Sequence, residues 1–231
     1  MQVIRSRDGR VEIADACLND VYDVVLFEMK ALWLKDDLAA EDDYERFIRH
    51  LRERYGKAFA QLSRAISRIS TGEWAPEGAD FSMARRIYPV LLVNDPLVAV
   101  PVYTQFLASE FASALSPENT LPSPMMKKGR FLVAPLIVMT LDDLETLETS
   151  IEHFSLCDLL KHYQEADPER TEALWRFMIL QYGERLRASQ SVASKSIKLL
   201  EKTTAALFPG HNLIDHPTRV SPQGGTAPQL L

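Results

Sequence analysis

The sequence predicts a mixed α/β fold, in which a central sheet of about five strands carries flanking helices and a helical C-terminal half. Strand-like segments at residues 2–6, 11–18 and 22–30 open the chain. A long amphipathic segment at 42–70 follows, with apolar residues at helical spacing. The apolar segment at 86–93 is continuous rather than alternating, which is typical of a strand covered on both faces.

The first three strands are expected to form an antiparallel meander. Asp8-Gly9 and Asn19-Asp20 are turn signals between them. The segment 22–30, YDVVLFEMK, is rich in the β-branched and aromatic residues that strands favour.

The segment 42–70 is predicted to be one long helix. Acidic residues cluster in its first turns, where the helix dipole favours negative charge, and Gly72 is a natural stop signal. Its other faces carry arginines, which either contact phosphates or form a solvated face balanced by acids. The apolar residues spaced by three and four, as one buried stripe requires, are Phe47, Ile48, Leu51, Tyr55, Phe59, Leu62, Ile66 and Ile69.

One more helix and one more strand complete the predicted sheet region. The helix is expected at 103–115, after the strand at 86–93. The segment 116–130 holds three prolines and is predicted to be a loop. The segment 131–139 is another apolar strand, in which Pro135 indicates an edge position.

The rest of the chain is predicted to be helical. Thr140 is expected to cap a helix, because Asp142 and Asp143 follow in the first turn. The helices expected here are 141–151, 156–164, 169–186 and 189–207. We therefore expect an α/β core at 1–140, a helical region at 141–207 packed on it, and an irregular, partly disordered tail at 208–231.

Composition narrows the class of protein. The chain has 231 residues and a formal net charge of −6, so any nucleic-acid binding needs a local basic surface. No apolar run reaches membrane-spanning length, and the charged N-terminus lacks the apolar core of a secretory signal. Two cysteines, Cys17 and Cys157, make no disulfide framework and fit a reducing compartment. We expect a cytoplasmic protein without a membrane partner.

Several common catalytic motifs are absent from the sequence. The five histidines show no zinc-ligand spacing with the cysteines. The sequence contains neither a Gly-x-Ser-x-Gly motif nor a glycine-rich phosphate-binding loop. A zinc enzyme, a serine hydrolase and a P-loop nucleotidase are therefore disfavoured.

Three charged residues on two neighbouring strands carry the chemical argument. Glu28 and Lys30 are two positions apart in a predicted strand, so their side chains project to the same face. A hairpin would bring Asp15 alongside them. Two carboxylates and an ammonium at one place suit a hard divalent metal and a phosphodiester.

A purely structural interpretation of these residues is also open. Asp15, Asp20 and Asp23 can be turn and strand-end acids, while Glu28 and Lys30 form a same-face ion pair on an exposed strand. Asp23 also competes with Asp15 for the site. It lies five residues before Glu28, with opposite parity, so it should face away and Asp15 is preferred.

In these residues the sequence resembles the PD-(D/E)XK nuclease superfamily, which includes many restriction endonucleases. Ala14-Asp15 matches the Pro-Asp element, and Glu28-Met29-Lys30 matches the acid-x-lysine element. The family core has the order helix, three strands, helix, strand, and residues 1–95 match it from the first strand onward. Ala14 replaces the usual proline, and the family's first helix has no room before the strand at residue 2.

The resemblance implies a metal-dependent endonuclease that hydrolyses phosphodiester bonds in DNA or RNA, with a role in prokaryotic defence. It implies that Asp15 and Glu28 bind Mg²⁺ or Mn²⁺, that the Met29 carbonyl adds a ligand, and that Lys30 is the catalytic lysine. A homo-oligomer or a partner protein is expected to supply the first helix. The alternative is a catalytically inactive nuclease-fold scaffold that binds a partner protein.

Overall fold

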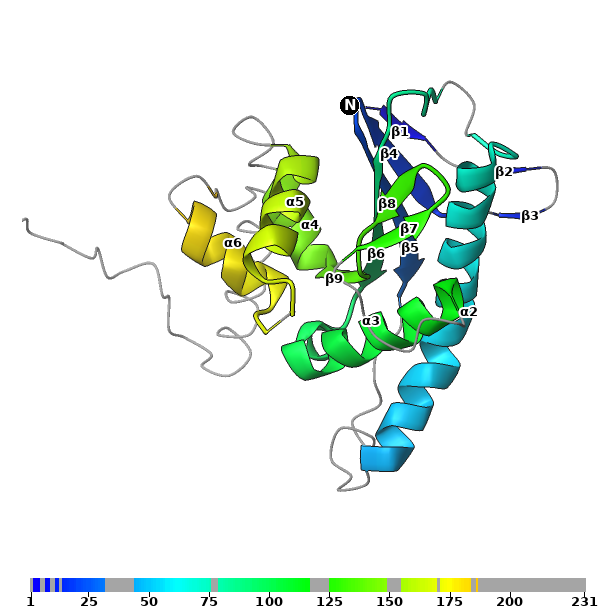
Figure 1. The fold of residues 1–231 in the computed structure, drawn as a ribbon. Helices are drawn as coiled ribbons and strands as arrows, with labels where there is room; N and C mark the ends of the chain where they lie inside the picture. The colour runs from blue at the N-terminus through cyan, green and yellow to red at the C-terminus, as the bar shows by residue number, and fades with distance from the viewer. Residues whose placement is uncertain are drawn as a thin grey trace, which may run out of the picture. The chain divides into compact units, whose positions relative to one another are not determined.

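The computed structural model describes residues 2–4, 7–8, 11–12, 14–31, 44–75, 79–116, 125–148, 155–169, 171–183 and 186. All of them belong to one compact unit, Met1–Arg187. A mixed sheet with helices on both faces forms the centre of this unit (Figure 1), so the predicted α/β class is confirmed. The predicted helix at 189–207 and the tail at 208–231 lie outside the described residues.

The first strands of the main sheet form the predicted antiparallel meander. β1 (Gln2–Ile4) pairs with β4 (Ala16–Asp20), and β4 pairs with β5 (Asp23–Lys30). The turn predicted at Asn19-Asp20 is wrong, because β4 continues through both residues and the chain reverses at the next two. The Val21 amide donates a hydrogen bond to the Asp20 carboxylate at 2.8 Å, which stabilises the start of this tight turn.

A separate hairpin lies between β1 and β4 in the chain. β2 (Arg7–Asp8) pairs with β3 (Val11–Glu12), and Asp8 lies opposite Val11, as the Asp8-Gly9 turn signal predicts. The strand predicted at 11–18 is therefore split, and only its second part joins the main sheet.

β6 (Arg86–Val93) is the central strand and runs parallel to β5. The strand predicted at 131–139 is interrupted, because β8 (Phe131–Val133) and β9 (Ile137–Thr140) lie end to end along β6. The interruption holds Pro135 and faces the part of β6 that holds Pro89. Neither proline has an N–H to donate, so the ladder cannot be continuous there.

An unpredicted strand extends the sheet beyond β8. β7 (Met126–Lys128) pairs antiparallel with β8. The prediction of a loop at 116–130 is therefore wrong for these three residues. The two-residue turn between these strands begins at Gly129, whose φ of +58° suits a hairpin turn. With this strand and the divided β8 and β9, the five predicted strands become a seven-stranded sheet.

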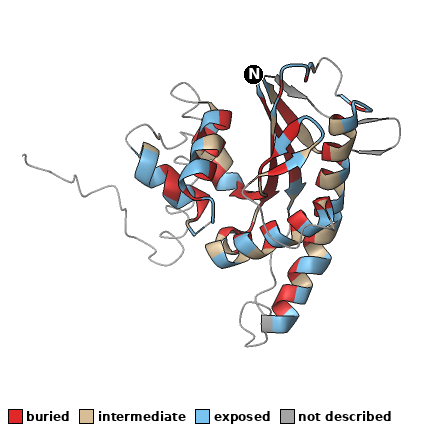
Figure 2. Cartoon of the chain, viewed as in Figure 1, coloured by how far each residue is buried: buried red, intermediate tan, exposed pale blue. Residues whose placement is uncertain are grey.

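Two α-helices and a short 3₁₀ helix cover one face of the sheet. They are α2 (Tyr44–Thr71), η1 (Pro96–Ala99) and α3 (Pro101–Leu115). All eight apolar residues predicted to form the buried side of α2 are buried, which confirms the periodicity argument (Figure 2). Gly72 ends α2 with a φ of +74°, and the next amide, that of Glu73, donates to the Arg68 carbonyl at 2.9 Å.

Three shorter helices pack on the other face. They are α4 (Leu141–Glu148), α5 (Leu156–Ala166) and α6 (Leu174–Tyr182), whose apolar residues share a core with β5, β6 and β9. The predicted cap of α4 is confirmed, since the Asp143 amide donates to Thr140 Oγ1 at 3.0 Å and the Thr140 amide donates back to Asp143.

α6 begins later than the helix predicted at 169–186. The carboxylate of Asp167 accepts hydrogen bonds from the amides of Thr171 and Glu172, at 2.9 and 2.8 Å. These bonds hold the chain in a loop between α5 and α6, so the helix starts at Leu174.

Candidate functional site

Glu28 and Lys30 form an ion pair at the end of β5. Glu28 Oε1 and Lys30 Nζ are 2.6 Å apart, and the side chains are 0% and 23% exposed. Val24 and Leu26, which have the same parity, belong to the core shared with α2 and α3, so the pair projects toward that face. The ion pair of the structural interpretation therefore forms, but the strand that carries it is buried. A carboxylate removed from water needs compensating partners, and Lys30 is one of them.

The structure brings Asp15 to the same end of β5. The Asp15 amide donates to the Phe27 carbonyl at 3.1 Å, and Asp15 Oδ2 accepts a hydrogen bond from the Met29 amide at 2.6 Å. The Asp15 carboxylate therefore lies at the peptide bond between Glu28 and Met29. Met29 is 50% exposed, whereas Glu28 is buried, so Met29 contributes its backbone here.

This end of β5 belongs to the carboxyl edge of the parallel strands. The register places Lys30 opposite Val93 of β6, and Val93 opposite Thr140 of β9. Ligands of open α/β sheets bind beyond this edge. Two further acids, Asp95 and Asp143, follow β6 and β9 here, and both are buried. The sequence pattern marked them only as a strand end and a helix start.

Burial shifts the titration of two groups along this part of the fold. Burial raises the pKa of Tyr55 on α2 to about 12, and the negative charge of Asp95 adds to the rise. Burial also raises the pKa of the Asp143 carboxyl, although its hydrogen bonds with Thr140 oppose the rise. Charges in this poorly solvated environment interact more strongly than charges in water do.

The donors at the end of β5 suit a hard divalent cation in their chemistry. Asp15 and Glu28 have carboxylate oxygens and Met29 has a backbone carbonyl, and Mg²⁺ prefers oxygen ligands while keeping several waters. One oxygen of Asp15 already accepts the Met29 amide, and one of Glu28 already accepts Lys30. Within the described ranges, no group of three or more His, Cys, Asp or Glu side chains is arranged to hold a metal. These donors therefore fit a metal site with two carboxylate ligands, completed by the Met29 carbonyl and water.

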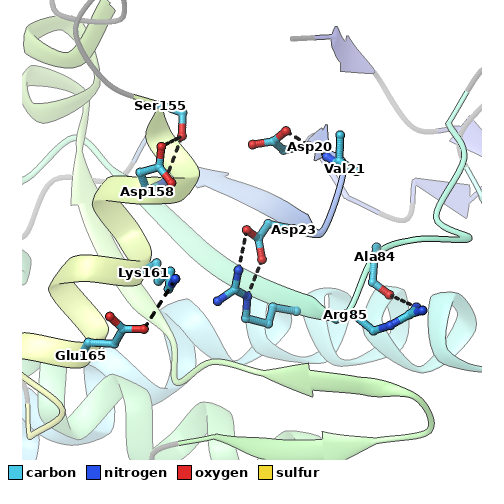
Figure 3. A network of polar contacts seen from close by, with 10 residues as sticks. Asp20, Val21, Asp23, Ala84, Arg85, Ser155, Asp158, Lys161 and Glu165 are labelled. Atoms are coloured by element: carbon cyan, nitrogen blue, oxygen red, sulfur yellow. Dashed lines mark hydrogen bonds and ion pairs between the residues drawn. The ribbon is translucent and has the colours of Figure 1, made fainter.

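Asp23 lies at the opposite end of β5 and does not join this site. Its carboxylate accepts two hydrogen bonds from Arg86, at 2.6 and 3.0 Å, which tie the start of β5 to the start of β6 (Figure 3). Asp20 stabilises the turn before it, as described above. Asp20 and Asp23 therefore have the strand-end roles of the structural interpretation.

A surface cavity of about 540 Å³ also lies at this opposite end. Its lining comes from the end of β4, the loop before β6 and the start of α5. The Asn19 amide group donates to the Asp80 carbonyl at 3.0 Å, across 61 positions of sequence. Ser155 accepts a hydrogen bond from the Asp158 amide at the start of α5, beside the Asp20 turn (Figure 3). No local sequence pattern indicates a cavity built from three distant segments.

Comparisons with known proteins find no match to this chain among protein-family models, curated proteins or solved structures. The resemblance to PD-(D/E)XK nucleases therefore stays a prediction from the residues. Among the helices that the structure describes, none is long and apolar enough to cross a membrane.

Proposed function

We propose that this protein is a metal-dependent nuclease of the PD-(D/E)XK type, which hydrolyses phosphodiester bonds in DNA or RNA. One observation carries the proposal. A fully buried glutamate, Glu28, pairs with Lys30 at 2.6 Å at the carboxyl edge of the parallel strands, and Asp15 is hydrogen-bonded to the adjoining peptide.

The order of elements supports the same proposal. A meander of β1, β4 and β5 is followed by α2 and then by β6, which is parallel to β5. The superfamily resemblance predicts three strands, a helix and a strand in this order, with the acid-x-lysine element on the third strand. Glu28 and Lys30 lie on β5, which is the third strand of the meander.

Each residue has a definite task in this proposal. Asp15 and Glu28 would hold Mg²⁺ or Mn²⁺ with the Met29 carbonyl, and the bound ion would stabilise the negative charge that develops on the phosphate. The Lys30 ammonium, oriented by Glu28, would hold the attacking water and balance charge on the phosphate. The Asp15 bond to the Met29 amide keeps the two strand ends together.

Cleavage assays test the proposal. Supercoiled DNA, linear DNA and single-stranded RNA are incubated with the wild-type protein and Mg²⁺ or Mn²⁺, beside Glu28→Gln and Lys30→Met. Glu110→Gln is the control, because it removes a carboxylate from an ion pair with Arg52 on the exposed side of α2 and α3.

We expect the wild type and Glu110→Gln to cut at equal rates, and each site variant to lose at least about 100-fold in rate. Cleavage that survives in Glu28→Gln and Lys30→Met would show that another site is responsible. No cleavage by any form, with every form folded, would favour the inactive scaffold.

A further inference from the structure

α2 concentrates positive charge in an acidic protein. Its 28 residues hold seven Lys and Arg against two Glu, a formal charge of +5 in a chain whose net charge is −6. A helix on the surface of an acidic protein needs no such excess for solubility. Whether this charge can bind a partner depends on where the unpaired cations lie on the helix.

Three of these cations lie along one side of α2. Arg49, Lys57 and Arg64 are exposed, and none of them forms an ion pair with another described residue. At 100° and 1.5 Å per residue they fall within an arc of about 80° and span about 22 Å. Glu53 also lies in this arc. We call Arg49, Lys57 and Arg64 the α2 stripe.

Several other cations of the described residues have a carboxylate partner. Arg52 pairs with Glu110 at 2.7 Å, and Arg176 pairs with Glu172 one turn before it at 3.1 Å. Lys161 lies 4.0 Å from Glu165. In the α2 stripe, by contrast, no cation forms an ion pair with a described residue, although Glu53 lies between Arg49 and Lys57 on the helix surface.

The α2 stripe faces solvent, on the side of α2 away from the sheet. On the helical wheel, the eight buried apolar residues of α2 centre about 180° from the stripe. Arg52 and Ser63, which contact Glu110 and Ala114 of α3, lie about 40–140° from the stripe residues. α2 packs on β5 through its apolar side (Figure 1). The stripe is therefore open to a ligand that contacts the outer side of α2.

We propose that the α2 stripe binds the phosphodiester backbone of a nucleic acid. The choice of this polyanion rests on the proposed function. Regularly spaced Arg and Lys side chains on a rigid helix contact phosphates without reading bases, and their contribution falls as salt rises. The stripe would thus supply a local basic surface on an acidic chain.

Binding without metal tests this proposal separately from cleavage. Fluorescence anisotropy of a labelled DNA duplex and a labelled single strand of about 20 nucleotides is measured in EDTA over a range of salt. The stripe variant is Arg49→Glu/Lys57→Glu/Arg64→Glu. The control, Lys127→Glu/Lys161→Glu/Arg176→Glu, makes the same change of net charge away from α2. Circular dichroism verifies the helix content of both.

We expect the stripe variant to bind more than about 10-fold more weakly and the slope of log K against log salt to lose about three in magnitude. The control should change affinity less than about threefold. The single variant Arg64→Gln, which tests the stripe if the triple variant fails to fold, should lower the slope by about one.

The outcomes separate the two proposals. No binding by the wild type, equal losses in both triple variants, or an unchanged stripe variant would overturn the binding proposal, even if the protein cleaves nucleic acid. Binding that depends on the stripe without any cleavage would uphold it and overturn the proposed nuclease. Stripe-dependent binding to vesicles of phosphatidylserine, with no binding to nucleic acid, would also overturn the binding proposal.

Discussion

The ion pair between Glu28 and Lys30 should contribute more to stability than a surface pair of equal length. The perturbation is a double-mutant cycle of Glu28→Gln, Lys30→Met and the double variant. The pair spans 2.6 Å, with side chains that are 0% and 23% exposed. Hydrogen bonds between charged groups contribute about 1.5–3 kcal/mol, and exposed pairs about 0.2–1 kcal/mol. We therefore expect a coupling free energy of about 2 kcal/mol.

Urea unfolding of the four proteins measures this coupling free energy. The matched control is the same cycle on Arg52 and Glu110, a 2.7 Å pair whose side chains are 56% and 26% exposed. Its coupling should stay below about 1 kcal/mol, because solvent screens it. A coupling between Glu28 and Lys30 no larger than that between Arg52 and Glu110 would refute the burial on which the site depends.

Three further predictions concern the fold around the site. Gly56→Ala should stabilise the protein by about 0.5–1 kcal/mol, since Gly56 lies inside α2 with open space around it. Gly72→Ala should destabilise the protein by about 1 kcal/mol, because the φ of Gly72 is +74°. Urea unfolding in which both variants shift stability in the same direction would contradict this. The raised pKa of Asp143 means that the folded state binds this proton more tightly than the unfolded chain, so stability is lost as pH rises from the ordinary value of 3.8 through the raised pKa. Asp143→Asn should therefore gain stability relative to the wild type between about pH 3 and pH 7, and a constant difference would oppose this. Burial raises the pKa of both Cys17 and Cys157 to about 12, so a thiol reagent at about pH 8 should label them in urea and not in the native protein; rapid native labelling would show that they are accessible.

Patterns local in sequence predicted the elements that support the site. The apolar residues of α2 keep helical spacing over eight positions, so their period is unambiguous, and β6 has the predicted bounds. Glu28 and Lys30 were predicted to share a face because strand alternation is a local rule. Asp15 was predicted to lie beside them because a single hairpin joins the two strands.

Features that depend on distant pairing were not predicted. The division of β8 from β9 reflects Pro89 and Pro135 together, and their alignment is visible only once β6 has its partners. β7 exists because β8 offers an edge, and its own three residues carry little strand signal. Asp95 lies at the carboxyl edge only because the strands before it are parallel.

The burial of Glu28 was missed for a related reason. A Glu two residues before a Lys is typical of an exposed strand, and the sequence alone cannot show that α2 covers this face of β5. The burial is also what distinguishes this pair from a surface ion pair, so the strongest feature of the site became visible only in three dimensions.

The most direct test of the central claim is to locate Mn²⁺ by anomalous scattering in crystals grown with the ion. We predict one Mn²⁺ bound by carboxylate oxygens of Asp15 and Glu28, at oxygen–metal distances of about 2.1 Å. This ion should be absent from crystals of Glu28→Gln. Mn²⁺ bound only elsewhere, or bound equally in Glu28→Gln, would contradict the assignment of Asp15, Glu28 and Lys30 as a metal-and-lysine site.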